Sequence, residues 1–374
     1  MTASEPISLP RYRIDRTYRW NYDHSPEPVK VDVTELAGSF SFAGLPTRGP
    51  LGVSAGPLLN GRWILYYASL GFDVLTYKTV RSRARQCYEL PNLVHVPDQR
   101  RLGGDSDVVA SGHSTGSWAV SFGMPSAPPD HWRADIESTR RQLAGDQLLN
   151  VSVVGTVQPH WTVEDLAADY AQCARWAGEA GADTVEANLS CPNVDTCDGQ
   201  LYQQPPQAGM VAEAIRQAIG SVPLILKIGH VMDESAGQRL LDAVATSTSA
   251  IAMTNSIPSR VAASVGGNWH FAGATRGICG LATYDASLRQ VAMFARLIES
   301  SRYKLKIIGV GGAGNAQQVR EYREAGAECV HLATAAMLRP DVALKIKHDL
   351  ASQSESPASR SRRRLRSVNG EPFQ

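Results

Sequence analysis

The stretch KIIGVGGAGNAQQVREYREAGAECVHLA, residues 306–333, contains two short apolar runs separated by a segment of helical pattern. The first run, KIIGV (306–310), is rich in β-branched residues and is followed by glycines, which is typical of a buried strand. The helical segment ends in Gly-Ala, as helices often do, and the second run is CVHLA (329–333). Buried strands that alternate with helices predict a parallel sheet covered by helices.

The same alternation runs through most of the chain. Helical patterns occur at 163–181 and 207–220, and apolar runs precede or follow them. The six further runs are LGVSA (51–55), DVLTY (73–77), LNVSVV (149–154), DTVEAN (183–188), PLILKI (223–228) and AIAMT (250–254). Eight such units predict an α/β fold of the (β/α)8 TIM barrel type, because eight strands close a barrel instead of forming an open sheet.

The remaining segments suggest how the chain is divided. Residues 1–45 are rich in Pro, Arg and Tyr, and we expect an N-terminal arm packed on a barrel of residues 46–350. Residues 351–374 are Ser- and Arg-rich, which predicts a disordered basic tail. The segments 81–127 and 256–283 are long and rich in Gly, Ser and Arg, and we expect irregular βα loops. Both follow strands, so both should lie on the C-terminal face, where barrel active sites occur.

Composition narrows the functional classes. Of the 374 residues, 43% are hydrophobic and the net charge is +1, which fits a globular enzyme and does not favour nucleic acid as a partner. The six cysteines form no CxxC pair, so we expect no bound metal. The N-terminus lacks a signal-peptide core, and no apolar run approaches the roughly 20 residues of a membrane span. We therefore expect a cytoplasmic protein without a membrane partner.

The glycine-rich turn after the strand at 306–310 is a candidate phosphate site. Backbone N–H groups at the start of a helix bind phosphate, and the loops after strands seven and eight form the usual phosphate site of barrels. The pattern differs from the dinucleotide fingerprint, which favours a mononucleotide such as FMN over NAD. The loop TRGICGLA (275–282) is expected to close around the same phosphate. The candidate phosphate-loop residues are Gly280, Gly311, Gly312, Ala333 and Thr334.

The segment EANLSCPNVDTC, residues 186–197, combines a strand end with amide and thiol side chains. Asn188 and Asn193 can each donate and accept hydrogen bonds, which suits a cyclic imide or amide ligand. Cys191 lies between them, and a thiol pKa of about 8.5 makes it a feasible proton acceptor. A buried cysteine beside a tight turn is the alternative. The position at a barrel strand's C-terminal end favours the catalytic interpretation.

The string N-L-S-C-P-N resembles the catalytic motif of the dihydroorotate dehydrogenases, with cysteine as in the class 1 enzymes and the related dihydropyrimidine dehydrogenases. Six more stretches resemble that family in the family's order, and the likeness covers roughly residues 45 to 348. They are SAGPLLNG (54–61), GFDVLTYKTV (71–80), LILKIG (224–229), MTNSI (253–257), IIGVGGAG (307–314) and HLATAAM (331–337).

The resemblance implies roles for individual residues. It assigns Lys78 and Lys227 to the flavin of FMN, and Lys78 also to catalysis, while the alternative is that one lysine pairs with a neighbouring carboxylate. The other implied cofactor residues are Ala55, Gly56, Thr79, Asn150, Asn188 and Thr254. The implied substrate residues are Asn188, Asn193, Asn255, Ser256, Gly123 and Met124.

The resemblance also implies a reaction in pyrimidine biosynthesis. Dihydroorotate, or a related dihydropyrimidine or cyclic amide, would give a hydride to flavin N5, with Cys191 as the proton acceptor. Val120 and Ser126 stand where the family usually has asparagines, and this difference argues against dihydroorotate itself as the substrate. The alternative is an FMN-dependent ene-type reductase or dehydrogenase acting on another unsaturated amide. The electron acceptor is left open between fumarate and a partner subunit, and a homodimer is a further expectation.

Two interpretations from other classes stay open. A Schiff-base aldolase would use Lys227 as the nucleophile on the same barrel. A non-catalytic binding barrel would use the basic tail to recruit a partner.

Overall fold

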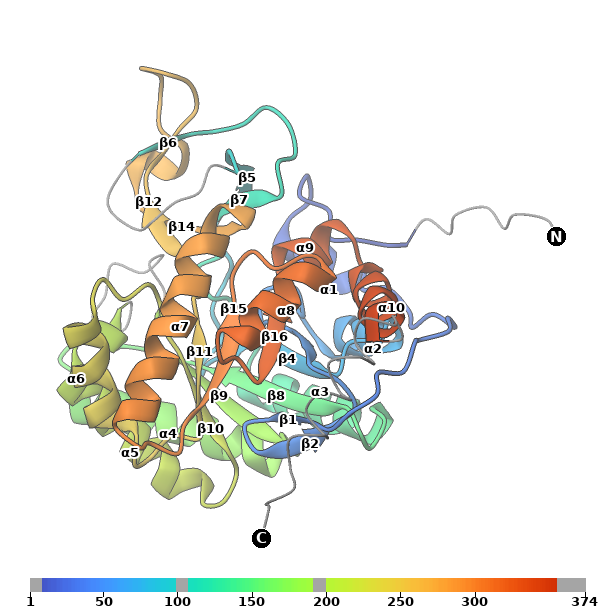
Figure 1. The fold of residues 1–374 in the computed structure, drawn as a ribbon. Helices are drawn as coiled ribbons and strands as arrows, with labels where there is room; N and C mark the ends of the chain where they lie inside the picture. The colour runs from blue at the N-terminus through green and yellow to red at the C-terminus, as the bar shows by residue number, and fades with distance from the viewer. Residues whose placement is uncertain (1–8, 99–106, 191–199, 355–374) are drawn as a thin grey trace, which may run out of the picture.

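The computed structural model describes residues 9–98, 107–190 and 200–354. Eight parallel strands form a closed barrel, and neighbours along the chain are neighbours in space (Figure 1). The barrel strands are β3 (Leu51–Val53), β4 (Val74–Val80), β8 (Leu148–Val153), β9 (Thr184–Asn188), β10 (Leu224–Lys227), β11 (Ala250–Met253), β15 (Lys306–Val310) and β16 (Cys329–Leu332). Each predicted strand is present, and the predicted TIM-barrel fold is confirmed.

Helices surround the barrel, and four of them begin at a residue whose side chain caps the first turn, namely α2, α4, α6 and α8. Thr162 and Asp165 form a capping box at the start of α4, and the Asn315 side chain accepts from the N–H of Gln318 at the start of α8. The outer helices are α2 (Gly61–Ser69), α3 (Pro129–Gln142), α4 (Val163–Glu179), α5 (Pro205–Ile219), α6 (Glu234–Val244), α7 (Tyr284–Ser300), α8 (Ala316–Glu324) and α10 (Val342–Ser354). Shorter helices are η1 (Leu201–Gln203), η2 (His270–Gly273), η3 (Leu281–Thr283) and α9 (Thr334–Leu338).

The two faces of each barrel strand have different surroundings. Leu149 and Val151 of β8 belong to the large apolar cluster that includes the buried faces of the helices. Leu148 belongs instead to a separate apolar cluster with Ile225 and Phe42 inside the barrel. Because side chains alternate along a strand, Asn150 and Ser152 share the inward face with Leu148. The upper interior of the barrel is therefore polar.

A hairpin closes the N-terminal end of the barrel. It consists of β1 (Phe40–Phe42) and β2 (Leu45–Thr47), which pair antiparallel. The Phe42 ring stacks on His331 with ring centroids 5.2 Å apart. The hairpin therefore covers the barrel interior at this end.

The segment before the hairpin packs along α2. It contains α1 (Tyr18–Asp23), and Trp63 donates from Nε1 to the carbonyl of Asn21. Tyr66 donates its hydroxyl to the carbonyl of Pro10. The division of the chain at residues 45 and 350 stays a prediction, although α10 continues to Ser354. The predicted disordered tail lies outside the described residues beyond that point.

The two long insertions contain strands, so the expectation of irregular loops was wrong. A four-stranded antiparallel sheet, here called the roof sheet, has the order β12 (Ile257–Ser259), β14 (Arg276–Gly280), β7 (Ser117–Val120) and β5 (Leu93–His95). Next to it, β13 (Val261–Ala262) pairs with β6 (Val108–Val109). Figure 1 shows these strands beyond the end of the barrel that lies opposite the hairpin.

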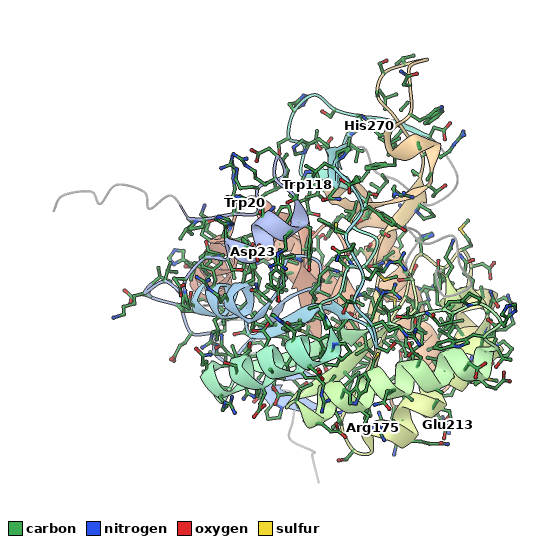
Figure 2. The ribbon with its side chains drawn as sticks, turned by 180° about the vertical axis from the view of Figure 1, so that it is seen from behind. Trp20, Asp23, Trp118, Arg175, Glu213 and His270 are labelled. Carbon is green, nitrogen blue, oxygen red and sulfur yellow. The ribbon has the colours of Figure 1, made fainter. Side chains whose placement is uncertain are left out.

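Figure 2 shows the same arrangement from behind. Trp118 and His270 lie at the roof end, whereas Arg175 of α4 and Glu213 of α5 lie at the far end of the molecule. In the ranges that the structure describes, no helix has the length and apolar character needed to cross a membrane.

Candidate active site

A cavity of about 480 Å³ lies between the C-terminal ends of the barrel strands and the roof sheet. Its volume falls in the range of roughly 300–1,000 Å³ that is usual for small-molecule sites. Strand ends, the glycine-rich loops and the roof sheet all contribute to its lining. The predicted residues that line it are Ala55, Gly56, Lys78, Thr79, Met124, Asn188, Lys227, Asn255, Ser256, Gly280, Gly311, Gly312, Ala333 and Thr334.

The floor of the cavity contains a buried ion pair. Lys227 Nζ lies 2.5 Å from Glu186 Oε1, and both side chains are almost fully buried. Lys227 also donates to Ser152 Oγ at 3.4 Å, and Ser152 is 3.0 Å from the Thr79 hydroxyl. The alternative that one lysine pairs with a neighbouring carboxylate is therefore confirmed for Lys227. This lysine still lines the cavity, so the pair supplies it with a polar floor.

The second predicted lysine, Lys78, is also buried and lines the cavity. Its positive charge opposes the effect of burial on the nearby Cys87 thiol, whose pKa burial raises to about 11. Cys87 does not line the cavity and stays protonated near neutral pH, so it is not the nucleophile of this site.

Two asparagines hold the chain immediately before the predicted catalytic loop. Asn188 Oδ1 accepts from the N–H of Ser190 at 3.2 Å, and Asn255 Nδ2 donates to the carbonyl of Ser190 at 2.5 Å. Ser190 is itself buried. The predicted Cys191 and Asn193 lie outside the described residues, so the structure says nothing about their positions.

The predicted phosphate loops meet at one end of the cavity. A Cβ added to Gly312, where φ is +75°, would lie 2.9 Å from the carbonyl oxygen of Gly280. A Cβ added to Gly280 would lie 3.0 Å from Thr334 Cγ2. The loops after β14, β15 and β16 are therefore in contact here, and glycine is needed for that close approach.

Sequence reasoning missed a cation at this glycine-rich end. Arg339 lines the cavity and donates from NH2 to the carbonyl of Gly314 at 2.9 Å. Its position just after HLATAAM was the available signal, because a cation near a phosphate loop is chemically useful.

Three predicted residues lie behind the lining. Asn150 Oδ1 accepts from Thr184 at 2.8 Å and its Nδ2 donates to Thr76 at 3.2 Å, so its amide belongs to a polar layer inside the barrel. Thr254 is fully buried, and a Cβ added to Gly123 would clash with the Tyr88 ring. None of these three residues lines the cavity, so the structure offers each of them no direct contact with a ligand there.

His331 is a buried residue that sequence reasoning did not select. Within the described chain, neither of its ring nitrogens has a hydrogen-bond partner. Burial lowers the pKa of His331 to about 4; the Glu186 carboxylate opposes this shift and Lys227 adds to it. A neutral imidazole therefore lies close to the ion pair under the floor.

The sequence as a whole matches a known family. The family model described as dihydroorotate dehydrogenase matches residues 39–353. The chain belongs to the dihydroorotate dehydrogenase family. Membership makes it an oxidoreductase that acts on a CH–CH bond. In the described ranges, no group of three or more His, Cys, Asp or Glu side chains is placed to hold a metal ion.

Two relatives and one solved structure show how far the likeness extends. The dihydroorotate dehydrogenase of Dictyostelium discoideum is 30% identical over 362 residues, covering 91% of this chain and 97% of the relative. The dihydroorotate dehydrogenase (quinone) of Bordetella avium is 27% identical over 342 residues, which cover 88% of this chain and 85% of the relative. The structure of DHODH from Eimeria tenella in complex with ferulenol has a TM-score of 0.72 at 18% sequence identity. The match covers 90% of this chain and 89% of that chain. This last likeness concerns the fold.

The two positions at which the resemblance led us to expect asparagines, Val120 and Ser126, have different surroundings. Val120 lines the cavity, so an apolar side chain faces the ligand space at this position. Ser126 does not line the cavity, and its hydroxyl accepts from the N–H of Arg81 at 3.0 Å while donating to the carbonyl of Ala127. Ser126 therefore contributes to the loop's internal hydrogen bonding.

The roof sheet and Phe122 contribute lining residues, and of these only Val120 and Gly280 were singled out from the sequence. They came from segments expected to be irregular, so no periodicity marked them. The lining residues on this side include Leu93, Trp118, Val120 and Cys279 of the roof sheet, together with Phe122, two residues beyond β7. Their contribution makes this side of the cavity largely apolar.

Proposed function

We propose that this member of the dihydroorotate dehydrogenase family uses FMN to oxidise dihydroorotate, or a related dihydropyrimidine or cyclic amide, with Cys191 as the proton acceptor. The observation that carries the proposal is a single cavity that joins the glycine-rich loops to Lys78, Lys227 and two asparagines. A phosphate cradle, buried cations and ring-binding amides are what a flavin and a cyclic amide would require together.

The residues present fit FMN. A Cβ added to Gly56 would meet nothing within 4 Å, so this glycine leaves space in the lining. The buried Ser54 hydroxyl also lines the cavity and has no hydrogen-bond partner among the described residues. Gly280, Gly312 and Thr334 would hold the phosphate group. When bound, FMN supplies a ring that accepts a hydride.

The chain's own groups divide the remaining work. Lys78 and Lys227 would place positive charge near the redox ring, which favours the acceptance of negative charge there. Asn188 and Asn255 would orient the substrate ring while holding Ser190. Cys191 would take the proton from the substrate carbon next to the one that loses hydride. The role of Cys191 is supported by its motif, and Asn193 is proposed as a substrate residue on the same basis.

The acceptor and the assembly are parts of the same proposal. Fumarate and a partner subunit are the two acceptor classes that we retain, and reoxidation of the reduced protein by fumarate would separate them. We also propose a homodimer in the cytoplasm.

Individual lining residues favour or oppose two other functions. An ene-type reductase of another unsaturated amide is favoured by Val120, which lines the cavity at a position where the resemblance led us to expect an asparagine. A Schiff-base aldolase needs Lys227 as a free amine, and the 2.5 Å contact with Glu186 argues against that role.

The test is anaerobic reduction of the flavin-loaded protein. We expect purified protein to show the visible absorbance of bound flavin and to lose it when dihydroorotate or a related dihydropyrimidine is added. Protein that neither carries nor takes up FMN would contradict the proposal. Trapping of a substrate on Lys227 by borohydride would establish the aldolase instead.

A further inference from the structure

The roof sheet has one face toward the cavity and one face away from it. Along β7, Trp118 and Val120 line the cavity. Ala119 lies in an apolar cluster within the roof, and the Ser121 hydroxyl accepts from Arg276 Nε at 2.8 Å. This alternation continues to Phe122, which lines the cavity again. The cavity therefore meets every second side chain of this strand.

The face toward the cavity is apolar. Leu93 of β5 lies opposite Val120 in the register and lines the cavity beside it. Trp118 donates its only polar hydrogen to His95 Nδ1 at 2.7 Å, inside the roof sheet. Among the described residues, no charged side chain of the roof sheet lines the cavity.

The two ends of the cavity can be identified from contacts. At the start of β7, Gly116 approaches Gly280, which approaches Gly312 in the phosphate loops. Past the other end of β7, the Met124 sulfur accepts from Asn188 Nδ2 at 3.4 Å. The apolar face between these points therefore extends from the glycine-rich end to the amide end.

We propose that the substrate is a dihydropyrimidine or cyclic amide that carries an apolar substituent, with its ring amides on the floor and the substituent under the roof. The inference rests on the proposed function and specifies the substrate class. Asn188 and Asn255 provide hydrogen bonds for the ring edge, while Trp118, Val120 and Phe122 provide a surface that excludes water from the substituent.

Physical chemistry separates this substrate class from a carboxylated ring. An aromatic or branched substituent gains from leaving water, whereas a carboxylate against the roof sheet loses its hydration and meets no charged side chain among the described roof-sheet residues that line the cavity. We therefore expect a benzyl substituent to strengthen binding by about ten- to a hundred-fold relative to a carboxylate on the same ring.

The experiment is a spectral titration of the flavin-loaded protein. The ligands are orotate, 5-benzyluracil and 6-benzyluracil, and the readout is the change in flavin absorbance on binding, which does not depend on turnover. At least one benzyl compound should bind about ten-fold or more tightly than orotate.

Two variants make the test specific to the cavity face. Val120→Asn places a carboxamide in the roof and should reduce or reverse the preference for the benzyl compounds. Val109→Asn makes the same change at an exposed residue of β6, in the two-stranded sheet next to the roof sheet. Val109 does not line the cavity, and the variant should keep the wild-type preference.

The outcomes distinguish failure of the proposed substrate class from failure of the proposed function. Flavin-loaded wild-type protein that binds orotate more tightly than both benzyl compounds would overturn the substrate class alone. Because the wild-type ranking decides this point, a variant that fails to fold does not rescue it. A chain that binds no FMN would overturn the proposed function, and the substrate class with it.

Discussion

The floor and the roof of the cavity are built on different principles. The floor consists of strand ends whose polar groups hold one another, as Lys227, Glu186 and Ser152 do. The roof consists of short strands whose apolar side chains face the ligand space. The difference indicates that the floor provides the charge and hydrogen bonding of the reaction, while the roof selects the shape of what is bound.

The two regions are also held in place differently. In the barrel register Lys227 lies beside Asn188, so closure of the barrel determines the spacing of the floor. The roof depends on its own sheet and on Phe122, whose ring meets Tyr12 and Tyr18 edge-on at 5.9 and 6.1 Å. Substitutions in the floor should therefore cost activity or folding, and those in the roof should mainly change ligand preference.

The largest expected effect tests the chemistry assigned to the floor. Cys191→Ala should lower kcat by about 10²–10⁴-fold, because a general base is removed, while flavin stays bound. Steady-state kinetics and the flavin spectrum measure this. Cys87→Ala, a thiol outside the cavity, should keep turnover near the wild-type value. Near-normal turnover of the Cys191 variant would remove the cysteine from the mechanism.

The next effect concerns the ion pair. Glu186→Gln should lower the free energy of unfolding by about 3–5 kcal/mol, because it leaves the Lys227 ammonium buried without its carboxylate. Urea unfolding of the flavin-free protein gives the value. The double variant Glu186→Gln with Lys227→Met should recover much of the loss, since no unpaired buried charge remains.

An exposed ion pair offers the matched control. Arg296 and Glu234 are 2.6 Å apart, but both side chains are more than half exposed. Glu234→Gln should change the free energy of unfolding by no more than about 1 kcal/mol. Equal losses of unfolding free energy in Glu186→Gln and Glu234→Gln would show that burial does not increase the contribution of the floor ion pair to stability.

A smaller effect depends on pH. Burial lowers the pKa of His331 from 6.5 to about 4, so at intermediate pH the unfolded chain binds a proton that the folded chain does not. The stability from this group is complete above about pH 6.5 and is lost as the pH falls toward 4, by about 3 kcal/mol in total.

Unfolding at several pH values checks this dependence. His331→Phe should show a shallower decline between pH 7 and pH 4 than the wild type. His348→Gln, at an exposed histidine of α10, should follow the wild-type curve. Parallel curves for wild type and His331→Phe would show that His331 does not destabilise the fold in acid.

The smallest effect belongs to the roof. Trp118→Phe removes the hydrogen bond to His95 but keeps an aromatic ring against the cavity. The free energy of unfolding should fall by only about 0.5–1.5 kcal/mol, with the ligand preference retained. A loss as large as that of Glu186→Gln would mean that the roof is as tightly coupled to the core as the floor is.

Much of the floor was predictable from sequence because its elements are local. Most barrel strands are mainly apolar runs, and a helix follows each of them directly or after an insertion. A lysine such as Lys227 at the end of such a run already indicates an unusual buried cation. The ion pair itself was harder to predict from the sequence. Glu186 is separated from Lys227 by α5, and only the pairing of β9 with β10 brings the two together.

The strands of the roof sheet were not predicted from the sequence, for a different reason. Its strands have three to five residues, and β7 pairs with β14, which lies in the other insertion. Short runs among Gly, Ser and Arg carry too little periodicity to be distinguished from loops. The apolar lining around Val120 therefore depends on the pairing of strands from the two insertions, which the sequence does not indicate.

The sequence by itself determined the barrel, the order of its strands and the family, because these depend on apolar periodicity and on short contiguous motifs. Only the tertiary structure decided that Lys227 is paired, that Asn150 serves the barrel interior and that the cavity has an apolar roof. These features arise between segments far apart along the chain, where hydrogen-bonding partners and burial are set by strand register and packing.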